Sequence, residues 1–132
     1  MSKKKCIIDK YDTIYEFSVY VVVNPDKKIV DDYFEWKNDE DKSILLENTG
    51  FVAYTNCGVY GKRDKKQCIV VVFNNISENM LENINTCAHE SLHVVMDIMR
   101  SAHVKFSDDS EEAFAYLQGW ITERLYKTIS KV

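Results

Sequence analysis

The feature that most constrains the fold is a change of residue pattern near the middle of the chain. Residues 1–75 are rich in Val, Ile, Tyr and Phe, whereas apolar residues in 76–130 recur at intervals of three and four. β-Branched and aromatic residues favour strands, and the second pattern is typical of amphipathic helices. The sequence therefore predicts an α+β fold in a single domain, 1–132, with a small, mostly antiparallel sheet packed on two long C-terminal helices.

The first half contains three strand candidates, at residues 15–24, 51–60 and 67–74. Each is a short run of β-branched or aromatic residues bounded by turn-forming residues. Residues 27–48 are ambiguous, because their apolar residues have helix-like spacing that the charged run 38–42 interrupts.

The second half predicts two helices joined by a short loop. Ser77 is the predicted N-cap of the first helix, which ends at Arg100 or Ala102. Asp108 or Asp109 is the predicted cap of the second helix. The residues expected to face the core are Leu81, Ile84, Ala88, Leu92, Val95 and Met99 in the first helix, and Phe114, Leu117, Ile121, Leu125 and Ile129 in the second.

Charge and hydropathy exclude several classes of protein. A net charge of −4 and a pI near 5.4 argue against a general binder of nucleic acids or anionic membranes, which needs a cationic surface. The longest apolar run, residues 68–73, is too short to span a bilayer, and no signal-peptide core follows the basic start. We therefore expect a soluble, cytoplasmic protein.

The four cysteines form no C-x-x-C pair, which argues against a zinc site built from thiolates alone. In a cytoplasmic chain we expect them to remain free thiols. Cys87 lies about 200° from His89 on a helix, so it is expected to pack in the core.

Residues 89–93 read H-E-S-L-H, an H-E-x-x-H motif. Four residues make one helical turn plus about 40°, so the imidazoles of His89 and His93 project from one face and can bind one Zn²⁺. Glu90 lies beside the metal, where it can take a proton from a zinc-bound water. The competing interpretation is a solvated helix face.

A zinc site also needs a third protein ligand. Met96 and Met99 exclude the longer H-E-x-x-H-x-x-G-x-x-H pattern. Glu112, early in the second helix, is the preferred candidate, on a face shared with Ala115, Tyr116 and Gly119. The alternatives are His103 as the ligand, and Glu112 as part of a helix cap, with Glu111 solvated beside it.

The order His89-Glu90-x-x-His93 followed by Glu112-x-x-Ala115 resembles the gluzincin branch of zinc metallopeptidases. The resemblance covers residues 70 to about 125 and extends to very small H-E-x-x-H proteins of bacteria and their phages. It implies His89, His93 and Glu112 as metal ligands and Glu90 as general base. It also implies a zincin-like fold in which the strand at 67–74 forms the sheet edge that receives an extended substrate.

One position departs from the gluzincin pattern. Tyr116 stands where an Asp or Asn commonly orients a ligand, so either a catalytic phenol or a core tyrosine is expected there. Asp97, four residues after His93, is a candidate to orient that imidazole, or a plain surface residue.

Two functions follow as expectations. The first is a zinc-dependent peptidase-like hydrolase with a peptide or protein substrate. The second is a non-enzymatic, zincin-like binding or regulatory module with a structural or vestigial metal site. An accidental motif in a structural protein is the third interpretation, and the oligomeric state stays open.

Overall fold

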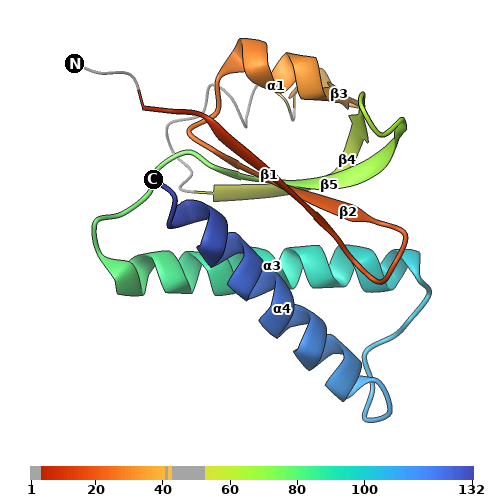
Figure 1. The fold of residues 1–132 in the computed structure, drawn as a ribbon. Helices are drawn as coiled ribbons and strands as arrows, with labels where there is room; N and C mark the ends of the chain where they lie inside the picture. Colours follow the sequence, from red (N-terminus) through yellow and green to blue (C-terminus); the bar gives the residue numbers. More distant parts are fainter. Residues whose placement is uncertain (1–3, 41, 43–52) are drawn as a thin grey trace.

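The computed structural model describes residues 4–40, 42 and 53–132 and contains a five-stranded sheet with helices on both faces (Figure 1). The α+β class predicted from the sequence is confirmed. The elements are β1 (Ile7–Asp12), β2 (Ser18–Val23), α1 (Lys27–Tyr33), β3 (Phe34–Trp36), β4 (Ala53–Gly61), β5 (Lys66–Phe73), α3 (Met80–Ser101) and α4 (Glu111–Ile129).

The strands are arranged in the order β1-β2-β5-β4-β3. Only β2 and β5 pair in parallel, with Val19 opposite Ile69, and the other pairs are antiparallel. Both central strands are valine-rich, and all of β2 is buried, as expected for strands covered on both faces.

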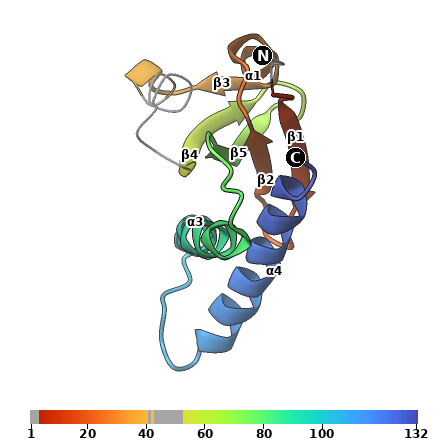
Figure 2. The same cartoon turned by 90° about the vertical axis from the view of Figure 1, so that its left-hand side faces the viewer.

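The two faces of the sheet carry separate cores. α3 and α4 cover one face, and α1 lies on the other (Figures 1 and 2). Alternation along β2 and β5 sends Val21 and Val71 toward the long helices and Val22 and Val72 toward α1. The long helices are therefore anchored to the centre of the sheet.

The predicted strands correspond to β2, β4 and β5, with residues 51–52 of one prediction outside the described residues. β1 is not predicted by the sequence, and α1 and β3 lie within the ambiguous residues 27–48. Asp26 caps α1 by accepting hydrogen bonds from the backbone N–H groups of Lys28 and Ile29, a local signal that fits a short helix.

The long helices lie close to their predicted positions. Asn79, not Ser77, caps α3 by accepting a hydrogen bond from Leu81 N. α4 begins at Glu111 after Ser110, rather than after an aspartate cap, and all five residues predicted to face inward are buried.

The buried face of α3 differs from the prediction. Leu81, Ile84 and Leu92 are exposed, and only Val95 and Met99 of the predicted stripe are buried. The residues that α3 buries are Cys87, Glu90, Ser91, Val94, Val95, Ile98 and Met99. Val95 and Met99 lie on the same side of α3 as the exposed leucines, so contact with the sheet and α4 covers only part of the predicted stripe, together with the positions around Ser91 and Val94.

Candidate metal centre

The two motif histidines converge on the outer side of α3. Their Nε2 atoms lie 3.3 Å apart, and the His89 side chain is 70% exposed. Two ligands at about 2.0–2.1 Å from a tetrahedral Zn²⁺ are separated by about 3.3–3.4 Å, so the pair already has a spacing that a metal requires. The same distance suits an N–H···N hydrogen bond between the rings in the metal-free protein.

Glu90 is placed beneath the histidines, on the side of α3 that faces β4. Its side chain is 5% exposed, and its Oε2 lies 3.9 Å from His89 Nε2. Thr55 on β4 donates a hydrogen bond to Glu90 Oε1 at 3.3 Å. Burial raises the pKa of Glu90, which His93, His89 and the Thr55 hydroxyl partly oppose.

The three motif side chains form one compact group. One ligating atom from each of His89, Glu90 and His93 lies within 4.8 Å of the others, so the group could hold a metal ion. A pocket of about 640 Å³ borders it, lined on α3 by these residues and Asp97 and on the other side by residues 53–58 of β4. The site is thus a shallow pocket between one helix and one strand.

Comparison with known proteins adds no relative. Neither a protein-family model, nor a curated protein, nor a solved structure matches this chain. The interpretation of the site therefore rests on its geometry and on the chemistry of its residues.

The structure does not bring Glu112 to the histidines. Thr122 of α4 donates to Ser91 of α3 at 2.8 Å, which aligns the middles of the two helices. Glu112 lies ten residues before Thr122, about 15 Å along the helix. Ser91 also lies nearly opposite the two histidines on α3, so α4 packs on the other side of that helix. Glu112 and Glu111 are both exposed.

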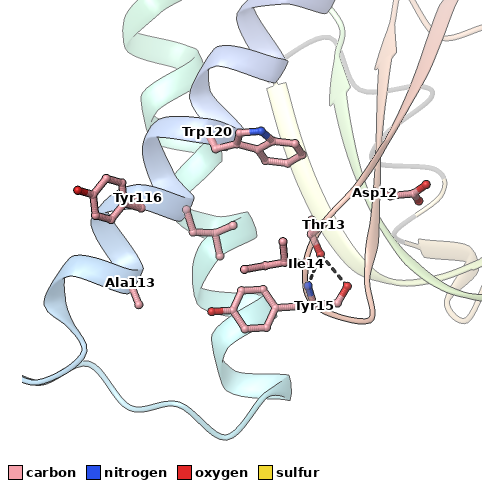
Figure 3. Close-up of a pocket in the computed structure, with 8 residues that line it drawn as sticks. Asp12, Thr13, Ile14, Tyr15, Ala113, Tyr116 and Trp120 are labelled. Atoms are coloured by element: carbon pink, nitrogen blue, oxygen red, sulfur yellow. Dashed lines mark hydrogen bonds between the residues drawn. The ribbon is translucent and has the colours of Figure 1, made fainter.

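Tyr116 also lies away from the histidines. It is 76% exposed and borders a second pocket, of about 450 Å³, between α4 and the loop after β1. In Figure 3 its ring projects from α4 on the side away from Ile14 and Tyr15. The predicted contact of Tyr116 with the motif is therefore absent within the described chain.

Of the two remaining candidates, Asp97 lies at the site and His103 lies away from it. Asp97 lines the pocket of the motif, but its carboxylate binds Arg100 at 3.1 Å rather than His93. His103 follows the end of α3 in a left-handed conformation, with φ of 60°, and lines a different pocket.

The strand that borders the site is β4, so the predicted role of residues 67–74 as a sheet edge is wrong. β5 lies between β2 and β4 because both strands pair with it. Thr55 and Asn56, which the sequence does not predict as site residues, line the pocket from a strand distant in sequence from the motif. No local pattern distinguishes them from other strand residues.

The cysteines play no part in the three-residue group. Cys57, Cys68 and Cys87 are free thiols, and burial raises the pKa of Cys68 and Cys87 to about 12. Cys87 is fully buried, as predicted. Within the described part of the chain, no helix is both long enough and apolar enough to cross a bilayer.

Proposed function

We propose that the protein is a zinc-dependent, peptidase-like hydrolase. The observation that carries the proposal is the 3.3 Å separation of His89 Nε2 and His93 Nε2 beside a buried carboxyl group. Histidine nitrogens are preferred zinc ligands, and two of them one helical turn apart form half of a tetrahedral site. The thiols of Cys57, Cys68 and Cys87, which form no disulfide, accord with a cytoplasmic location.

Bound zinc would supply a Lewis acid that lowers the pKa of a water molecule and polarises a carbonyl group. Glu90 would accept the proton of the attacking water and return it to the leaving amine. Burial raises the pKa of this carboxyl group toward the working pH, which suits a group that must take up and release a proton. Thr55 would hold the carboxylate in place.

An extended peptide fits the shape of the site. The pocket is bounded by residues 53–58 of β4, whose backbone runs beside the motif helix. A peptide lying along this strand would present its carbonyl groups to the histidines and Glu90. We therefore propose a peptide or protein substrate.

The second candidate is a non-enzymatic binding module that keeps this frame. Among the described residues, only two histidines and Glu90 form the group, whereas a catalytic zinc site uses three protein ligands and an open position. A site without a third ligand would hold its metal weakly and serve binding rather than hydrolysis.

Metal analysis and a peptide-cleavage assay test the proposal together. We expect about one zinc per chain and cleavage of members of a mixed peptide library. The Glu90→Gln variant should keep its zinc and lose activity by about 100- to 10,000-fold. Zinc retention without cleavage by the wild type would favour the binding module. Absence of zinc from the wild type would overturn the hydrolase.

A further inference from the structure

We infer that the pocket between α4 and the tip of the β1–β2 hairpin binds an apolar side chain of a basic segment in a partner protein. The hairpin tip is residues 13–17, and the pocket has a volume of about 450 Å³. None of its lining residues borders the pocket of the two histidines. The inference therefore goes beyond the proposed function and does not depend on a metal.

One wall of the pocket is the hairpin tip, which is held by hydrogen bonds. Thr13 Oγ1 donates to the carbonyl oxygen of Phe17 at 2.8 Å and accepts from the backbone N–H of Tyr15 at 3.2 Å. The backbone N–H of Thr13 also donates to Phe17 O, at 3.3 Å. These bonds close the turn around Ile14, which is 94% exposed at the edge of the pocket. An isoleucine fixed in solvent offers apolar area that a partner buries on binding.

The other wall is one side of α4. Ala113, Leu117 and Trp120 line the pocket and follow one another at intervals of four and three residues, so they share a helix face. Trp120 is fixed in place by two neighbours. Its ring centroid lies 6.5 Å from that of Tyr11, in an edge contact, and 4.9 Å from the guanidinium carbon of Arg124. Because both walls are already formed, a ligand loses little free energy to ordering them.

The surface between the two walls is mainly apolar and aromatic. Figure 3 shows Trp120 extending from α4 toward the hairpin, and Tyr15 extending from the hairpin toward α4. The polar side chains of the hairpin wall bond within the hairpin, since Asp12 accepts from Ser18 Oγ at 2.8 Å and Thr13 closes the turn. A pocket of this size and lining suits a single large apolar side chain, such as that of leucine or phenylalanine.

The segments that form the two walls carry an excess of acidic residues. Five exposed acids lie in the hairpin tip, or in the loop and first turn that lead into the α4 wall: Glu16, Asp108, Asp109, Glu111 and Glu112. None of them forms an ion pair among the described residues. Residues 105–112 contain one lysine against four acids, and residues 13–17 contain one acid and no cation.

The cations that flank the pocket do not cancel this excess. Lys10 pairs with Asp12 at 3.6 Å and with Asp64 at 3.2 Å, and Arg124 pairs with Glu123 at 3.2 Å. The acids of the hairpin tip and of the start of α4 therefore remain to attract a cationic partner. The same charge repels anionic lipids, so it favours a basic protein segment over a membrane as the ligand of this apolar pocket.

Titration with short peptides, followed by NMR of the ¹⁵N-labelled protein, tests the inference. The probe is a capped peptide with one phenylalanine between two pairs of lysines. At low salt we expect it to shift the signals of the Trp120 indole N–H and the Ile14 amide, with half-saturation at about 1 mM. Replacing its phenylalanine by alanine, or its lysines by glutamates, should weaken binding by at least about tenfold.

Substitutions at exposed positions test the two parts of the site separately. Ile14→Ser removes apolar surface without touching the core, and it should weaken binding of the lysine peptide by about fivefold. Glu16→Gln should weaken binding by about threefold at low salt and have no effect at high salt, because salt screens exposed charges. Ile29→Ser, at an exposed isoleucine of α1 on the other face of the sheet, is the matched control and should bind like the wild type.

Three results would overturn the inference. The first is the absence of shifts at Ile14 and Trp120 with the lysine peptide at about 10 mM. The second is equal binding of the lysine, alanine and glutamate peptides. The third is sedimentation of the wild type, but not of Ile14→Ser, with vesicles of phosphatidylcholine and phosphatidylserine, which would assign the hairpin tip to a membrane. Each of these results leaves the metal site and the proposed function intact.

Discussion

The two long helices differ in how far their acidic residues are buried. α3 buries Glu90 to 4% exposure, with the hydroxyl of Thr55 as its hydrogen-bond donor. α4 leaves Glu111 and Glu112 in solvent on its first turn. Burial of a carboxylate costs free energy, so Glu90 needs a compensating role, whereas acids at a helix start are favoured by the dipole alone. The burial of Glu90, more than its place in the H-E-x-x-H motif, therefore distinguishes it from Glu111 and Glu112.

The largest effect should come from the exposed side of α3. His93→Ala removes one of two converging nitrogens and should weaken zinc affinity by more than about 100-fold. His103→Ala is the matched control, since this histidine lies outside the group, and it should bind zinc like the wild type. Competition with a chromophoric chelator measures both. Equal affinities for the two variants would remove the basis for a site on α3.

The support beneath Glu90 should have the next largest effect. Thr55→Val removes the hydroxyl that donates to the carboxylate and should lower kcat by about tenfold, with zinc content unchanged. Thr55→Ser keeps the donor and should restore most of the rate. A Thr55→Val variant with unchanged kcat would show that Glu90 is positioned by packing alone.

The contact between the two helices should have a smaller effect, on stability. Thr122→Val removes the hydrogen bond to the buried Ser91 hydroxyl, which still donates to Ala88 O. We expect the free energy of unfolding to fall by about 1 kcal/mol. A double-mutant cycle with Ser91→Ala, measured by urea unfolding, isolates the pair. Coupling near zero would mean that apolar packing alone aligns α3 with α4.

How far the fold follows from the sequence depends on the element. α4 is apolar on one side only, and five of its six buried positions follow from the sequence, the exception being Thr128. α3 has one broad apolar face, on which Val95 and Met99 of the predicted stripe are buried and Leu81 and Leu92 are exposed. Tertiary contact with the sheet and α4 decides how much of that face is covered, so only part of the predicted stripe is buried.

Some features of the site could likewise be predicted from the sequence, and others could not. The spacing of His89 and His93 is local to one helix, so their convergence could be predicted. Thr55 arrives from β4, and its contact with Glu90 depends on how the sheet packs on α3. The position of Glu112 depends on the register between two helices, which the loop between them does not fix.

The smallest effect should come from Glu111, the neighbour of Glu112. It lies about 100° from Glu112 on α4, and it is exposed. Glu111→Gln removes one favourable charge at the helix start, so stability should fall by no more than about 0.5 kcal/mol, and zinc affinity should stay within about twofold of the wild type. Thermal unfolding and chelator competition check these values against Glu112→Gln. A large loss of zinc with Glu111→Gln and none with Glu112→Gln would mean that Glu111, and not Glu112, contributes to zinc binding.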